Sequence, residues 1–118
     1  MENVKGGNME SINLSFLHGN HDRQHYELRA AVLKALAHPS RLMIIDELSR
    51  GERTVQELTE LVGHDISTVS KHLHLLKTSN MLEADKRGKQ VYYRLRIPCI
   101  VNFFHCLEAV IAADRNSR

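Results

Sequence analysis

The feature that most constrains the fold of this chain lies within residues 54–95. Two short segments with helical spacing of apolar residues are followed there by two segments in which apolar and polar residues alternate. Thr54 and Glu57 have the spacing of a capping box at the start of the first helix, and Gly63 is placed to end it. Asp65 is the expected N-cap of the second helix. Two short helices joined in this way and followed by a hairpin predict a winged helix-turn-helix.

Helices are also expected on both sides of this region. Apolar residues recur with helical spacing from Arg23 until His38, and again from Pro39 to a stop at Gly51. A last helix is expected to begin at Pro98.

Between these helices, apolar and polar residues alternate around the basic sequence 85–89, as in a two-stranded hairpin. The predicted fold is therefore mainly α with a small β-hairpin wing. Its expected parts are a flexible N-terminal arm over residues 1–20, a winged helix-turn-helix domain over 21–113 and a polar tail over 114–118.

Composition excludes several classes of protein. The chain has 118 residues, which fits one domain with a modest hydrophobic core. No run approaches the roughly eighteen apolar residues of a membrane span, and the first residues lack a signal-peptide stretch, so we expect a cytoplasmic protein with no membrane partner. The two cysteines cannot build a disulfide framework.

Catalytic motifs are missing as well. The sequence has no glycine-rich phosphate loop, no HExxH pair and no plausible catalytic triad, so we do not expect an enzyme.

Charge is distributed unevenly along the chain. The net charge of +2 is too small to identify a nucleic-acid binder. Between residues 64 and 96, however, seven Lys or Arg residues oppose three Asp or Glu residues, which is a net charge of +4. Positive charge is thus concentrated on the second helix of the pair and on the hairpin, where contact with DNA phosphates would require it.

Candidate DNA contacts lie away from the apolar stripe of Val69, Leu73 and Leu76. Short hydroxyl side chains allow close approach to DNA, and a lysine can reach a phosphate or a guanine edge. A solvated polar face is the alternative for any one of them, and a charged hairpin tip also serves solubility. The candidates are Ser67, Thr68, Ser70, Lys71, His74, Lys86, Arg87 and Lys89.

Four stretches together resemble the ArsR/SmtB family of winged-helix repressors, and the resemblance extends over about residues 23–112. They are LKALAHPSRL at 33–42, TVQEL at 54–58, ISTVSKHL at 66–73 and GKQVYYRL at 88–95.

The resemblance implies a homodimer, joined through its terminal helices, that binds double-stranded operator DNA with an inverted repeat. It also implies release from DNA when a metal, a metalloid or an oxidant reaches a sensor site. It assigns Ser67, Thr68, Ser70 and Lys71 to DNA contact and residues 87–89 to the wing. At Ile66 many members have a polar residue that is able to reach bases. The operator sequence of this protein therefore cannot be inferred from those of other family members.

The family's familiar metal sites are not retained. Residues 54–61 hold no cysteine, whereas the arsenite- and cadmium-responsive members carry a CxC pair on this helix. Val110 and Ala113 stand where later ligands of the zinc and nickel site would be.

Cys99 and Cys106, expected on the last helix, are the remaining sensor candidates, with His105 as a further ligand. Seven helical residues separate the two cysteines by about 10 Å, too far for a disulfide within one helix. If the last helices of two subunits pack antiparallel, as the resemblance implies, Cys99 of one subunit faces Cys106 of the other. Such pairs could hold a thiolate-bound metal or metalloid ion, could be oxidised to inter-subunit disulfides, or could be packing residues.

His18, His21 and His25 form a second candidate metal site. Histidines four residues apart share one face of a helix, but surface histidines in a flexible segment are the alternative.

The function expected from the sequence is thus a DNA-binding repressor of ArsR type, released by a metal, a metalloid or a thiol-reactive signal. The alternatives are a repressor that senses redox or reactive sulfur species through inter-subunit cysteine pairs, and a winged-helix protein-interaction module without a sensor.

Overall fold

The computed structural model describes residues 22–116. The chain divides between Lys34 and Ala35 into two units. The first contains most of α1 (Arg23–Leu36), and the second contains all the other elements. The predicted arm over residues 1–20 lies outside the described residues, as do His18 and His21.

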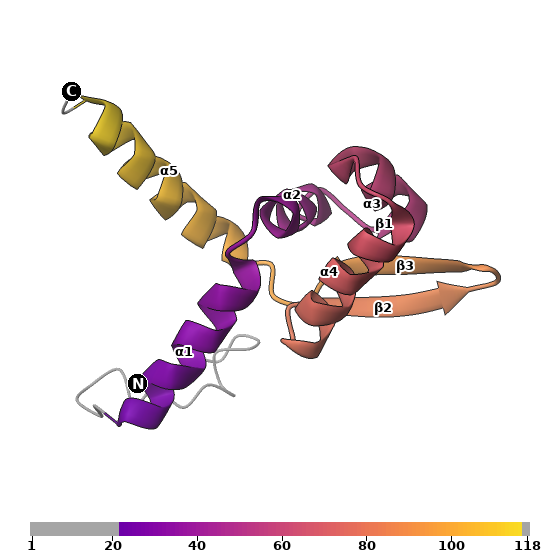
Figure 1. The fold of residues 1–118 in the computed structure, drawn as a ribbon, viewed down its shortest axis with the longest axis horizontal. Helices are drawn as coiled ribbons and strands as arrows, with labels where there is room; N and C mark the ends of the chain where they lie inside the picture. Colours follow the sequence, from indigo (N-terminus) through magenta and orange to yellow (C-terminus); the bar gives the residue numbers. More distant parts are fainter. Residues whose placement is uncertain (1–21, 117–118) are drawn as a thin grey trace, which may run out of the picture. The chain divides into compact units, whose positions relative to one another are not determined.

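The second unit has the element order expected of a winged helix-turn-helix (Figure 1). Its elements are α2 (Pro39–Leu48), β1 (Arg53–Thr54), α3 (Val55–Val62), α4 (Ile66–Thr78), β2 (Leu82–Arg87), β3 (Gln90–Leu95) and α5 (Ile100–Asn116).

The predicted start and end of α3 are confirmed. The Thr54 hydroxyl accepts a hydrogen bond from the Glu57 backbone N–H at 3.1 Å, and the Glu57 carboxylate accepts one from the Thr54 N–H at 2.8 Å. Gly63 ends α3 with a φ of +81°, a left-handed conformation that glycine adopts without strain. The capping box and the glycine therefore set the length of α3.

Asp65 caps α4 as predicted, because its carboxylate accepts a hydrogen bond from the Thr68 N–H at 3.1 Å. The apolar stripe of α4 is fully buried at Val69, Leu73 and Leu76. It packs with apolar residues of α2 and α3, so the core fixes which face of α4 meets solvent. The other large, fully buried side chains are Ile44, Ile45 and Leu58.

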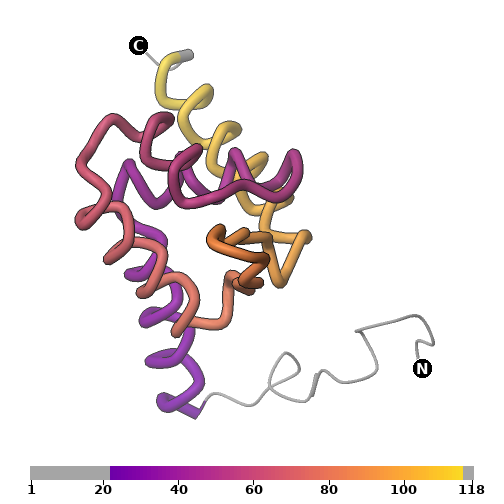
Figure 2. The backbone as a smooth tube through the Cα atoms, turned by 90° about the vertical axis from the view of Figure 1, so that its right-hand side faces the viewer, coloured from indigo at the N-terminus to yellow at the C-terminus, as the bar shows by residue number. Residues whose placement is uncertain are grey.

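The sheet is antiparallel and has the strand order β1-β3-β2. The prediction of a two-stranded hairpin was therefore incomplete, because the two residues of β1 add a third strand against Tyr92 and Tyr93. The hairpin closes at Gly88, where a φ of +62° is tolerated by glycine at the first position of a two-residue turn. Figure 2 shows the hairpin from its tip, which the helices leave uncovered.

The last helix begins later than predicted. Backbone hydrogen bonds from Ile100 to Ile97 and from Val101 to Pro98 form a turn, and α5 starts at Ile100. Cys99 lies in this turn, so its predicted placement on the helix was wrong. At the other end, α5 includes residues 114–116, which the sequence pattern assigns to a polar tail.

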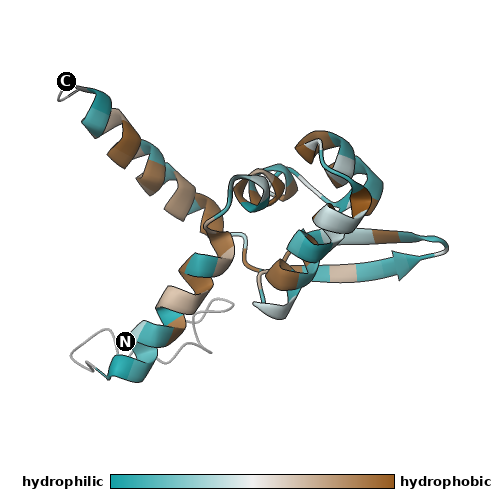
Figure 3. Cartoon of the chain, in the orientation of Figure 1, coloured by the Kyte–Doolittle hydropathy of each residue, from teal (hydrophilic) through white to brown (hydrophobic). Residues whose placement is uncertain are grey.

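Hydrophobic residues occur along most of α5 (Figure 3). Ile100 and Phe104 pack against the core, whereas Phe103, Val110 and Ile111 are exposed. Over the described residues, no helix is long and apolar enough to cross a membrane.

Candidate nucleic-acid interface

The outer face of α4 carries the predicted polar side chains. Ser67, Ser70, Lys71 and His74 are exposed, and Thr68 is half-buried. These side chains lie away from the buried apolar stripe of α4, and that stripe anchors the helix in the core. This arrangement allows hydroxyl, amine and imidazole groups to reach another macromolecule without disturbing the core.

The first turn of α4 is held by Asp65. The Ser67 hydroxyl donates to the Asp65 carboxylate at 3.0 Å, and the Thr68 N–H donates to its other oxygen. The hydrogen bonds from Thr68, followed by the one from Ser67, hold the pKa of Asp65 below its usual value. Two of the candidate contact residues are therefore oriented before any ligand arrives.

Lys86 lies near the end of β2 and Lys89 lies in the hairpin turn, and both are exposed. Within the described part of the chain, no carboxylate forms a salt bridge with either amine. Their charges are thus available to an anionic partner.

Arg87, between them, is engaged differently. Its guanidinium donates to both carboxylate oxygens of Glu52, at 3.0 and 2.8 Å, and to Asp85 at 2.9 Å. Its Cζ also lies 4.5 Å from the centre of the Tyr92 ring. The hydrogen bond from Arg87 is the main reason that the pKa of Glu52 is lowered.

Sequence reasoning counted Glu83 against the basic segment but missed the ion pairs that Glu83 and Glu52 form with its arginines. Arg94 contacts Glu83 at 3.0 Å and Glu52 at 3.4 Å, and Arg96 lies 3.6 Å from Glu83. The pairing of Glu83 with Arg94 across the hairpin was a signal in the sequence, because the two residues stand opposite each other in the register. The lysines consequently carry most of the unpaired charge.

His72 has a structural position. It is half-buried on α4, and its ring centre lies 4.5 Å from that of His38. Burial lowers the pKa of His72, and the charges of His38, Arg41 and His64 act in the same direction.

The candidate sensor residues do not form a metal site within one chain. Cys99 and Cys106 are both free and exposed. Among residues 22–116, no three His, Cys, Asp or Glu side chains are grouped so that they could hold a metal ion. His25 is the single described member of the second histidine set. The residues that the structure describes therefore do not fit a metal centre built from one subunit.

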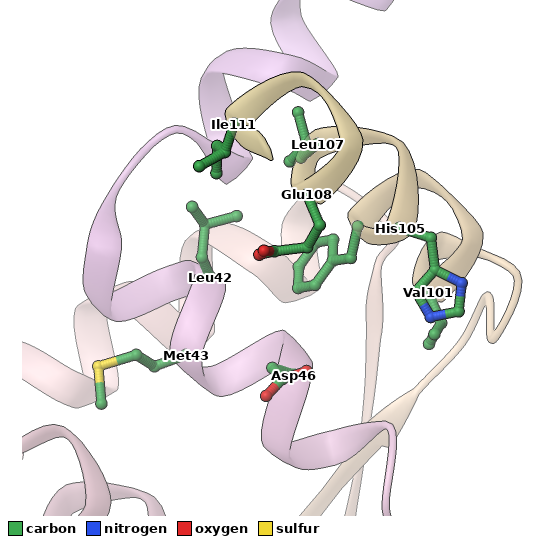
Figure 4. Close-up of a pocket in the computed structure, with 9 residues that line it drawn as sticks. Leu42, Met43, Asp46, Val101, His105, Leu107, Glu108 and Ile111 are labelled. Atoms are coloured by element: carbon green, nitrogen blue, oxygen red, sulfur yellow. The ribbon is translucent and has the colours of Figure 1, made fainter. Parts of the chain in front are cut away.

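A groove of about 400 Å³ lies between α2 and α5 and is largely apolar. Figure 4 shows the side chains of Leu42 and Ile111 pointing toward each other from the two helices. His105, Asp46 and Glu108 add polar groups to the lining. The groove continues the exposed apolar surface of α5.

Comparison with known proteins agrees with this geometry. A family model described as a helix-turn-helix domain matches residues 36–85. The biofilm growth-associated repressor of Xylella fastidiosa (strain 9a5c) is 41% identical over 85 residues, which cover 72% of this chain and 75% of that protein. The HTH-type transcriptional regulator Rv0324 of Mycobacterium tuberculosis is 36% identical over 81 residues, 69% of this chain. This match spans only 36% of Rv0324.

A solved structure extends the likeness over most of the chain. The homodimeric winged helix-turn-helix DNA-binding domain of Mb0332 from Mycobacterium bovis, described as a possible ArsR-family transcriptional regulator, superposes with a TM-score of 0.69. It is 31% identical in sequence, and the match covers 86% of this chain and 95% of that one. The chain belongs to the ArsR family of winged helix-turn-helix transcriptional regulators.

Proposed function

We propose that the protein is a homodimeric repressor that binds operator DNA, with α4 in the major groove and the hairpin as its wing. The observation that carries this proposal is the exposed polar face of α4 on a fully buried apolar stripe. The proposed DNA-contacting residues are Ser67, Thr68, Ser70, Lys71, His74, Lys86 and Lys89.

Two copies would place two α4 helices on one face of DNA. Exposed Phe103, Val110 and Ile111 on α5, beside the apolar groove, favour a second copy as the partner of this helix. A two-fold dimer reads an inverted repeat, with half-sites about one DNA turn, roughly 34 Å, apart.

The test is a binding titration on a DNA duplex that the protein itself selects from a random pool. Affinity should fall steeply with salt, because each phosphate contact contributes about 0.9 to the slope of log affinity against log salt concentration. Lys71→Ala should lower both the affinity and this slope, whereas Lys34→Ala, which removes an exposed lysine from α1, should change neither. Binding that ignores both salt and sequence would favour the protein-interaction alternative.

A thiol-based signal is the proposed switch. Both thiols are exposed in the single chain, so neither packs in its core, and pairs from two subunits would bring four thiols to one dimer. A soft metal, a metalloid or an oxidant captured there would shift the relative orientation of the two α4 helices and release the DNA.

Native mass spectrometry of the dimer after exposure to metals, arsenite and oxidants would identify what the cysteines capture. The Cys99→Ser/Cys106→Ser double variant should then bind DNA normally and no longer release it. Unchanged release from DNA would rule out these cysteines as the sensor.

A further inference from the structure

The ion pair of Arg87 and Glu52 joins two distant parts of the winged domain. Glu52 precedes β1 at one edge of the sheet, and Arg87 ends β2 at the other edge. Thirty-five residues separate them in sequence. The central strand β3 lies between, so this pair links both outer strands across the middle of the sheet.

Tyr92, on the central strand, lies under the Arg87 side of this ion pair. It stands opposite Thr54 of β1 and opposite Asp85 of β2 in the register, and the Arg87 guanidinium lies over its ring. Glu52, Arg87 and Tyr92 therefore hold the three strands together close to the hairpin turn. The attraction between the Arg87 cation and the face of the Tyr92 ring adds to the attraction between Arg87 and Glu52.

The geometry is stronger than that of an ordinary surface ion pair. Isolated exposed pairs contribute little, but two parallel hydrogen bonds between a guanidinium and a carboxylate fix the orientation of both groups. Here the third nitrogen of Arg87 is bound to Asp85, and Arg94 shares Glu52. Each of the three guanidinium nitrogens of Arg87 thus donates to a carboxylate, which uses three of its five N–H groups and fixes the orientation of the guanidinium.

We propose that Glu52 and Arg87 form a clamp that sets the direction of the wing, and that Arg87 is a positioning residue and not a phosphate contact. The clamp places the exposed amines of Lys86 and Lys89 toward the DNA backbone. This inference rests on the proposed DNA-binding function. The sequence pattern, in contrast, predicts Arg87 as a DNA contact.

Replacement of Glu52 distinguishes a clamp from a contact by the sign of its effect. E52Q removes a negative charge close to the proposed DNA surface. If Arg87 were a phosphate contact held back by Glu52, E52Q would tighten DNA binding. If the pair is a clamp, E52Q should weaken DNA binding by roughly two- to fivefold, the range of a lost ion pair converted to affinity.

The experiment measures the affinity of the full chain for a 20-bp duplex, selected by the protein from a random pool, between 50 and 200 mM salt. The proteins compared are wild type, E52Q, R87Q, K89Q and the charge swap E52R/R87E. R87Q should weaken binding with little change in the salt slope, whereas K89Q should lower the slope by about 0.9 per lost phosphate contact. The charge swap should recover most of the wild-type affinity, because it restores the pair in reverse.

The outcomes separate the clamp from the function on which it rests. If neither wild type nor any variant binds DNA, the proposed function fails, and the clamp fails with it. If wild type binds, the clamp is overturned by E52Q binding as tightly as wild type or more tightly, or by a charge swap that binds no better than R87Q. Thermal unfolding of each variant shows whether a weakened protein is still folded.

Discussion

The imidazole rings of His38 and His72 pack against each other with their centres 4.5 Å apart, which joins the start of α2 to the middle of α4. His38 also caps α2, because its Nδ1 accepts a hydrogen bond from the Ser40 N–H at 3.1 Å. A ring that stabilises the start of one helix thus rests on a half-buried ring of the helix proposed to read DNA.

This contact predicts a pH dependence of stability. The pKa of His72 is lowered from 6.5 by burial and by His38, Arg41 and His64. Just below pH 6.5 the unfolded chain therefore binds more protons at this residue than the folded chain does, and stability falls as the pH drops through that interval. Chemical denaturation from about pH 7.5 to about pH 5.5 should show this loss.

His72→Gln should reduce that dependence, since the uncharged amide does not titrate. The matched control is His74→Gln on the exposed face of the same helix, which should leave the pH profile of wild type intact. If the pH profile of His72→Gln were the same as that of wild type, protonation of the buried His72 ring would not be the cause of the loss of stability at low pH.

The capping box of α3 predicts a second effect on stability. Thr54 is 7% exposed, and its hydroxyl accepts the Glu57 N–H. Thr54→Ala should lower the free energy of unfolding by about 1 kcal/mol, because a helix-terminal donor loses its partner. Thr54→Ser keeps the hydroxyl and should lose less. Equal losses in the two variants would assign the effect to the missing methyl group.

The buried stripe of α4 predicts a larger loss. Leu73 has no exposed surface, whereas Leu75, two residues along the same helix, is 36% exposed. Leu73→Ala should cost about 2–5 kcal/mol in urea unfolding through lost burial and a cavity. Leu75→Ala should stay within about 0.5 kcal/mol, as is usual for surface positions. Similar losses at both sites would mean that the opposite face of α4 is also packed.

Local signals in the sequence account for most of the fold. The box of Thr54 and Glu57, the left-handed Gly63 and the cap at Asp65 act within four residues of the chain, so their spacing was sufficient to predict α3 and the start of α4. The alternation around Gly88 predicted the hairpin for the same reason.

Features that depend on distant residues were not predictable in this way. The two residues of β1 are too few to show an alternating pattern, and their strand exists because Arg53 pairs with Tyr93. The partner of Arg87 is 35 residues away, which no local pattern indicates. The sequence predicts Pro98 as the start of the last helix, but the turn from Ile97 delays α5 to Ile100.

We propose above all that α4 and the wing contact DNA. The most direct measurement is the change in backbone amide NMR signals when a duplex selected from a random pool is added to the full protein. The largest changes should fall on residues 66–74 of α4 and on residues 86–90 at the tip of the hairpin, and added salt should reverse them. Changes confined to α2, α3 or α5, with α4 and the hairpin turn unaffected, would contradict the account.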